Sequence, residues 1–278
     1  MIGAITAELL VIRKRSSTWV LVGLFVTLAV LFGYLFPYFI EADSGAPRAG
    51  QPLDDLLPGR LVGTTLGGFP FFGGALVLIL GVLTLGSDYG WGTLKTLFTQ
   101  RPSRLQVLGA KLAAVGVVLW AFVLADFAAA FVCSGLIAMR ESAPADWPSV
   151  WLLVRALAAA WFILAVWATL GVLLGVLMRG TALGIGIGIL YGLAIEGLFS
   201  AFFNRSDLLR PLIEAFLRAN AYSLVAPLGV SAEATRDNGP GSFSGPYVGG
   251  EQAALVLGVY LVAFVGLSAW IVRRRDVT

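Results

Sequence analysis

Residues 150–178 read VWLLVRALAAAWFILAVWATLGVLLGVLM, and Arg155 is the one charged residue among them. A helix needs about 20 mostly apolar residues to cross a hydrocarbon core of about 30 Å, so this stretch is long enough. Its apolar residues are continuous and do not alternate with polar ones, which favours a helix over a strand of a membrane barrel. The stretch therefore predicts a transmembrane helix.

Five further stretches outside this one have the same character, at about 17–40, 69–86, 107–139, 181–203 and 252–272. Of the 278 residues 58% are hydrophobic and 13% are charged, against about 25% charged in an average soluble protein. The mean hydropathy is +0.88. We therefore predict an all-α integral membrane protein, with six transmembrane helices in a single domain over residues 1–278.

Several classes of site are excluded by residue type. The chain has no histidine and one cysteine, Cys133, which rules out an internal disulfide, a histidine-based triad and most zinc or haem sites. It contains no phosphate-binding loop, no H-E-x-x-H and no G-x-S-x-G motif. We expect no catalytic residue, no metal and no cofactor bound by this chain. The net charge of +3 gives no reason to expect nucleic acid as a partner.

The basic residues predict the orientation in the membrane. Short loops with an excess of lysine and arginine stay in the cytoplasm. With six spans, the basic residues fall on one side and the acidic residues of the loops on the other. The basic set is Arg13, Lys14, Arg15, Lys95, Arg101, Arg104, Lys111, Arg179, Arg273, Arg274 and Arg275. We expect both termini in the cytoplasm and the chain as a multi-pass protein of the plasma membrane.

The parts outside the spans have characters of their own. Residues 1–15 carry apolar residues at helical spacing, which predicts an amphipathic helix lying in the membrane interface; the alternative is an extension of the first span. The segment 204–250 is expected as an extracytoplasmic loop. It contains an amphipathic stretch, 208–218, that favours a short helix on the outer membrane surface.

Two acidic residues lie within predicted spans, Asp126 in the third and Glu196 in the fifth. An ionised carboxylate at the bilayer centre is costly, so such residues usually face protein or water. One interpretation places both along a translocation path. The other is a structural hydrogen bond to a neighbouring helix, or a protonated acid.

Glycines recur every four residues in the fourth and fifth spans. This spacing places them along one face of a helix, where a second backbone can approach closely. The pattern predicts helix packing within the chain, and a seam between two copies is the alternative. The residues are Gly171, Gly175, Gly184, Gly188 and Gly192.

The loop between the second and third spans, residues 87–106, contains the most specific pattern. Leu94, Leu97 and Phe98 lie at helical spacing, which predicts a short amphipathic helix that ends before Pro102. Ser103 is placed to cap the next helix. Such a loop helix could bind another protein or could stabilise the turn alone.

This loop resembles the first cytoplasmic loop of the ABC-2 type permeases, the membrane subunits of ATP-binding-cassette exporters. That loop has an acidic residue, a Gly-Thr or Gly-Ser pair, an apolar stretch, a Ser-Arg pair and then a lysine entering the third span. The matching residues are Asp88, Gly92, Thr93, Leu94 to Phe98, Ser103, Arg104 and Lys111. The family usually has glutamate in place of Asp88. The motif covers about 25 residues, and the architecture is similar over nearly the whole chain.

The resemblance implies a permease subunit that pairs with a second copy or a related chain and binds a separate cytoplasmic ATPase, which would hold ATP and magnesium. The loop helix would be the coupling helix seated on that ATPase. Charges would set the docking, with apolar contact beside them, through Lys95, Leu97, Phe98, Arg101 and Arg104. An apolar interior favours export of a hydrophobic or amphipathic substrate.

Two other functions stay open at this point. A secondary transporter or channel driven by an ion gradient would use Asp126 and Glu196 as proton or cation sites. It predicts internal repeats, and the two halves of the chain show no clear self-similarity. A non-transporting scaffold subunit of a larger membrane complex would use the glycine stripes as contact seams.

Overall fold

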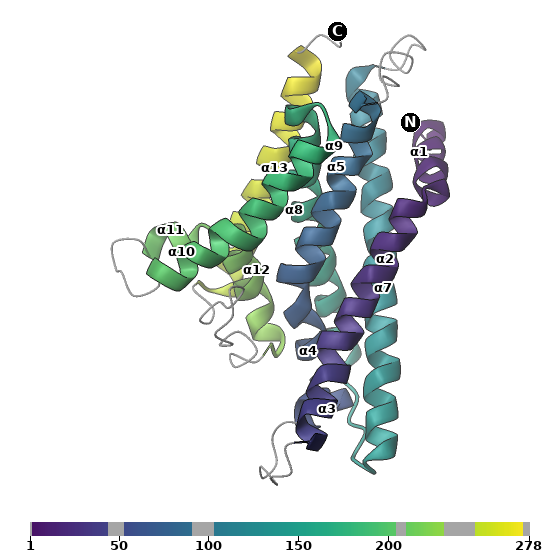
Figure 1. Cartoon of the computed structure of the whole chain (residues 1–278), viewed down its shortest axis with the longest axis vertical. Coiled ribbons are helices and arrows are strands. Elements are labelled where there is room, and N and C mark those ends of the chain that lie inside the picture. Colours follow the sequence, from purple (N-terminus) through teal and green to yellow (C-terminus); the bar gives the residue numbers. More distant parts are fainter. Residues whose placement is uncertain (1, 44–52, 91–102, 204–209, 231–247, 275–278) are drawn as a thin grey trace.

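The computed structural model describes residues 2–43, 53–90, 103–203, 210–230 and 248–274, and every regular element in these ranges is a helix (Figure 1). The longer helices are α1 (Ile2–Lys14), α2 (Ser16–Val30), α3 (Phe36–Asp43), α4 (Leu61–Gly68), α5 (Gly74–Gly90), α7 (Arg104–Arg140), α8 (Val150–Met178), α9 (Thr181–Ile189), α10 (Glu196–Phe203), α12 (Leu217–Val225) and α13 (Gly250–Arg274). Short α-helical, 3-10 and π-helical turns join them: η1 (Leu31–Leu35), η2 (Leu53–Leu56), η3 (Pro58–Arg60), η4 (Phe69–Gly73), η5 (Leu190–Ile195), α11 (Arg210–Glu214) and η6 (Ala226–Leu228).

Five helical stretches are long and apolar enough to cross a membrane. They are Ser16–Phe39, Arg104–Arg140, Val150–Met178, Thr181–Phe199 and Gly250–Arg274. Their outward faces carry large apolar side chains, as surfaces that contact lipid do. The prediction of an all-helical protein with membrane-spanning helices is confirmed at this level. Helix α7 has 37 residues, a length of about 55 Å, so it extends beyond a hydrocarbon core.

The stretch predicted as the second span, 69–86, is part of a longer helical run. That run begins at Pro58, passes through η3, α4 and η4, and continues as α5 to Gly90. Helix α5 has 17 residues and is the shorter apolar helix of the set. The π-helical turn η4 contains Pro70, which has no backbone N–H to donate, so the helix widens there. Residues 87–90, predicted as the start of the loop, are helical.

Helices α5 and α8 form the centre of the bundle and approach each other at glycines. The α-carbon of Gly81 faces the backbone carbonyl of Ala168, and that of Gly171 faces the carbonyl of Leu78. A side chain at either glycine would collide with that backbone. Phe25, Phe69 and Phe122 pack beside this pair, with ring centroids 5.3 Å and 5.8 Å from Phe25, and join α2 and α7 to η4. The core therefore combines a close helix pair with an aromatic cluster.

The segment 204–250, predicted as a loop with one helix on the outer surface, is described only in part. Its described residues form two short helices, α11 and α12, and the turn η6. The predicted helix over 208–218 corresponds to α11, where Leu212 is 49% exposed, and to the beginning of α12. Helix α12 itself packs against α13, α4 and α8, and most of its residues are buried. Gly229 ends η6 with φ +98°, and its carbonyl lies against Gly63 of α4. Helices α10 and α11 project to one side of the bundle (Figure 1).

The two described ends of the chain lie at the same end of the molecule. Helix α1 and the last turns of α13 are both at the top of the view, beside the end of α5 and the beginning of α7 (Figure 1). The predicted cap at Ser103 is confirmed: its hydroxyl accepts from the backbone N–H of Gln106 at 3.3 Å, and the Gln106 side chain accepts from Ser103 N at 3.1 Å. This capping box fixes where α7 begins.

Candidate functional site

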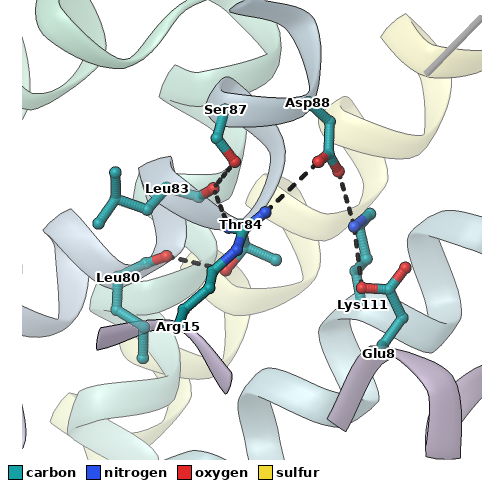
Figure 2. A network of polar contacts seen from close by, with 8 residues as sticks. All are labelled: Glu8, Arg15, Leu80, Leu83, Thr84, Ser87, Asp88 and Lys111. Carbon is teal, nitrogen blue, oxygen red and sulfur yellow. Dashed lines mark hydrogen bonds and ion pairs between the residues drawn. The ribbon is translucent and has the colours of Figure 1, made fainter. Parts of the chain in front are cut away.

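Four charged side chains meet at the end of the bundle where α1 lies, and we call them the polar network: Glu8, Arg15, Asp88 and Lys111 (Figure 2). Lys111 is at the centre. Its Nζ is 2.7 Å from Asp88 Oδ2 and 2.9 Å from Glu8 Oε2. Lys111 is 3% exposed and Asp88 is 5% exposed, so this ion pair is buried. The network joins α1, α5 and α7.

Arg15 completes the network from the junction of α1 and α2. Its Nη2 is 3.5 Å from Asp88 Oδ1, and its Nη1 donates to the carbonyl of Leu83 at 3.0 Å. The Ser87 hydroxyl donates to the same carbonyl at 2.6 Å. Arg15 has an extended backbone (φ −75°, ψ 119°) that ends α1 and starts α2, which turns its side chain toward α5.

The network balances two positive charges against two negative ones. A buried charge without a partner costs several kcal/mol, so each member depends on the others. The ion pair also has a geometric consequence. Asp88 lies two residues before the end of α5, and Lys111 lies two turns into α7. The pair therefore fixes the distance between the two helices that residues 91–102 connect.

The predicted coupling residues divide into two groups. Asp88 and Arg104 are described, whereas Gly92, Thr93, Lys95, Leu97, Phe98 and Arg101 lie outside the described residues. Asp88 points into the bundle toward Lys111 and Arg15, so its carboxylate serves the protein's own cations (Figure 2). Arg104 is part-exposed in the first turn of α7.

Glu196, predicted on a translocation path, has a structural partner. Its Oε1 accepts from the backbone N–H of Leu217 at 3.1 Å, and its Oε2 accepts from the N–H of Arg218 at 2.9 Å. These are first-turn N–H groups of α12, which have no partner inside their own helix. Arg218 is fully buried and donates from Nη1 to the carbonyl of Gly192 at 3.2 Å. Glu196 thus caps α12 from the neighbouring helix.

Asp126, the other acid predicted on a path, lies near the middle of α7 and is 2% exposed. Its Oδ2 makes no hydrogen bond with any described residue. The two acids that the sequence grouped together are therefore in different environments, and the structure does not bring them together. Glu196 accepts from two backbone amides, whereas Asp126 Oδ2 has no hydrogen bond from the described residues.

The predicted glycine stripes both face helices of the same chain. Gly171 and Gly175 of α8 face the backbone of α5. Gly184 and Gly188 face Val82 and Leu78 of α5 together with Leu174 of α8, and Gly192 faces the ring of Trp167. In an α-helix, residues four apart drift around the axis, and the wider turn η5 offsets that drift. As a result, Gly192 and Glu196 are buried on the same face of the helix as Gly184 and Gly188.

Sequence reasoning missed four side chains that the structure makes prominent. Glu8 and Arg15 were assigned to the interfacial helix and its basic cluster, and their contact with Asp88 and Lys111 is long-range. Arg218 lies off the apolar face of the amphipathic stretch 208–218, and the structure buries it. Tyr34 gave no signal, because its burial depends on the π-helical turn η1. Charge alternation between Glu8, Arg15, Asp88 and Lys111 was the one available hint.

Residues 64–278 match the model of a family described as a protein of unknown function, DUF2705. No curated protein matches the sequence. The matched region begins in α4 and includes Asp88, Lys111, Asp126 and Glu196, while Glu8, Arg15 and Tyr34 precede it.

Proposed function

The chain belongs to the DUF2705 family of proteins of unknown function, and we propose from its own residues that it is the permease subunit of an ATP-binding-cassette transporter. In this proposal it forms the translocation path for a hydrophobic or amphipathic substrate, pairs with a second permease copy, and binds a separate cytoplasmic ATPase. ATP and magnesium belong to that partner. The proposal rests on the loop motif and on the polar network beneath it.

The observation that carries the proposal is the buried ion pair between Asp88 and Lys111. A loop that transmits motion from a partner needs both of its ends held, because a loosely held loop would move without moving the helices. The ion pair holds the end of α5 and the start of α7 together, and Glu8 and Arg15 tie both to α1 and α2. Docking at residues 91–102 would therefore act on four helices.

The proposal also includes the membrane layout. Six spans require α5 to cross together with the five longer stretches, and its 17 residues lie at the lower limit of spanning helices. Helix α1 and the end of α13 lie at one end of the molecule, where lysine and arginine are concentrated, which supports a cytoplasmic location of both termini in the plasma membrane.

The test is affinity purification of the tagged full-length chain from its host in mild detergent. We expect an ATPase with a Walker motif to co-purify. The double substitution Leu97→Asp and Phe98→Asp is expected to abolish its recovery. The matched control, Leu97→Met with Phe98→Leu, keeps an apolar surface and is expected to retain it. A well-folded preparation without any ATPase would contradict the proposal.

A second purification tests the role of the polar network. Lys111→Met leaves residues 91–102 unchanged but removes the cation between the two acids. We expect weaker ATPase recovery than with Lys111→Arg, which keeps the charge. Equal recovery from both variants, each with a single gel-filtration peak, would show that the network has no part in docking.

One observation favours a second function, a transporter driven by an ion gradient. Asp126 is buried at mid-span without a hydrogen bond to Oδ2 from the described residues, as expected for an ionisable residue in a membrane that has a role in transport. Substrate uptake by the chain alone in vesicles, dependent on an imposed proton gradient and lost in Asp126→Asn, would favour it. The scaffold interpretation would fit recovery within a large complex.

A further inference from the structure

Three buried polar atoms near the middle and the C-terminal half of α7 have no hydrogen bond from the described residues. They are Asp126 Oδ2, Tyr34 Oη and Ser134 Oγ. These residues are 2%, 4% and 0% exposed. More than about 90% of buried polar groups in proteins have a partner, so unpaired atoms in one region need a physical reason.

Tyr34 reaches the interior because of a local change in helix geometry. It lies nine residues after Phe25, which is 1% exposed, and in an uninterrupted α-helix it would lie about 180° away, toward lipid. The π-helical turn η1 (Leu31–Leu35) inserts an extra residue and rotates Tyr34 inward. Such turns are frequent at functional sites and weaken the helix that contains them. Here the turn places a phenol in an apolar core.

Tyr34 lies where η1 contacts α4 and α7. Thr65 of α4 and Asp126 and Cys133 of α7 are the groups around the Tyr34 hydroxyl. The Thr65 hydroxyl donates to the carbonyl of Leu61 at 2.7 Å. Ser134 lies two turns beyond Asp126 on α7, about 12 Å farther along the helix axis, so it is a separate buried hydroxyl.

The charges around the site favour a proton over a metal ion. No lysine or arginine acts on Asp126 within the described ranges, and the titratable group that shares its surroundings is Tyr34. Those ranges also contain no group of three acidic, cysteine or histidine residues that could hold a metal. Hard cations such as Mg²⁺ require about six oxygen ligands, often with several carboxylates. A single carboxyl among hydroxyls matches a proton and water.

We propose that Asp126 and Tyr34 form a proton-binding site between η1, α4 and α7. A protonated Asp126 has one O–H to donate and one carbonyl oxygen to accept with, so it can pair with a hydroxyl or a water on each side. An ionised Asp126 can only accept and would need water or a cation. Release of the proton is therefore favoured when these helices separate and water enters. This inference does not depend on an ATPase partner.

The test uses dicyclohexylcarbodiimide, which reacts with protonated carboxyl groups in apolar surroundings. The purified full-length chain in lipid nanodiscs is treated over a series of pH values, and adducts are located by mass spectrometry of peptides. We expect an adduct at Asp126 that decreases as the pH is raised, since ionisation removes the reactive form. Asp126→Asn is the control, since it removes only the carboxyl group; Glu196, which is also buried, is a second position at which an adduct can form.

Two variants sharpen the test. Asp126→Asn should lose the adduct and also the protonated-carboxyl band in the infrared difference spectrum. Tyr34→Phe keeps the ring and removes the hydroxyl that can donate to an ionised Asp126, so labelling should persist to higher pH. An Asp126 that stays unlabelled at every pH in the folded wild-type chain would overturn the proposal. A Tyr34→Phe profile that matches wild type would remove Tyr34 from the site.

Discussion

Helix α7 has a buried charged residue near its beginning, Lys111, and a buried acidic residue near its middle, Asp126, and their surroundings are opposite in kind. At its beginning, Lys111 binds Asp88 and Glu8, and every member of the polar network has an oppositely charged neighbour. Near its middle, Asp126 is buried without one within the described ranges. Lys111, Asp88 and Asp126 are all buried, whereas Glu8 and Arg15 are partly exposed. The difference is that the first can hold its charges permanently, whereas the second can hold a carboxyl only in its neutral form or with water.

The largest expected effect comes from a substitution that leaves the acids of the polar network without their central cation, as Asp126 is without one. Lys111→Met leaves Asp88 and Glu8 facing each other without the cation between them, and loss of one partner of a buried pair costs about 3–5 kcal/mol. We expect a clear decrease of the thermal unfolding temperature in detergent. The double variant Asp88→Asn and Lys111→Met should recover part of the loss, because one orphaned charge is gone. A double variant less stable than Lys111→Met would contradict the pairing.

Glu196 provides the next test, since both of its carboxylate oxygens accept from backbone amides of α12. Glu196→Gln replaces one accepting oxygen by an NH₂ group that faces a backbone N–H of α12. An unpaired buried donor costs about 1–3 kcal/mol. We expect faster hydrogen exchange at the amides of Leu217 and Arg218, with exchange in α5 and α8 unchanged. Unchanged exchange at both amides would show that the cap contributes nothing.

Asp126 should respond with the opposite sign. Asp126→Leu removes an unpaired buried polar group and adds apolar contact, so we expect stabilisation by about 1 kcal/mol. The unfolding temperature should rise slightly, measured beside Ser134→Ala as a control that removes a smaller polar group on the same helix. Destabilisation by Asp126→Leu would show that the carboxyl has a permanent partner.

Glu8 is expected to have the smallest effect. Its side chain is 14% exposed, and an amide at the same place can still accept from Lys111. Glu8→Gln should therefore cost about half a kcal/mol, in the range of partly exposed ion pairs. Its effect should weaken further at high salt. A loss as large as that of Lys111→Met would mean that α1 carries more of the network than the distances indicate.

Features that depend on local pattern were predictable from the sequence, whereas features that depend on tertiary contact were not. Apolar runs and the Ser103 cap are local, so the membrane helices and the start of α7 were found within a few residues. The burial of Tyr34 depends on one π-helical turn that shifts the facing of every later residue, and no periodicity argument includes it. Asp88 was placed in a loop because the α5 helix extends four residues past the apolar run.

The candidate site shows the same division. Asp126 and Glu196 were found because a charged residue in an apolar run is conspicuous. Their separation into a bonded and an unbonded acid could not be predicted, since it depends on α12 folding back against α10. Glu8 and Lys111 are 103 residues apart in sequence, and nothing in either segment specifies the other.

The reciprocal contact of Gly81 and Gly171 limits how the bundle can move. Each glycine faces a backbone carbonyl of the opposite helix, and Val77 and Leu85 lie about one turn before and after Gly81. Sliding α5 along α8 by one turn would bring one of these side chains against that carbonyl. The two helices therefore keep a fixed register and move as one rigid pair. Any change of shape in the membrane must occur where α2, α7 and α13 contact this pair.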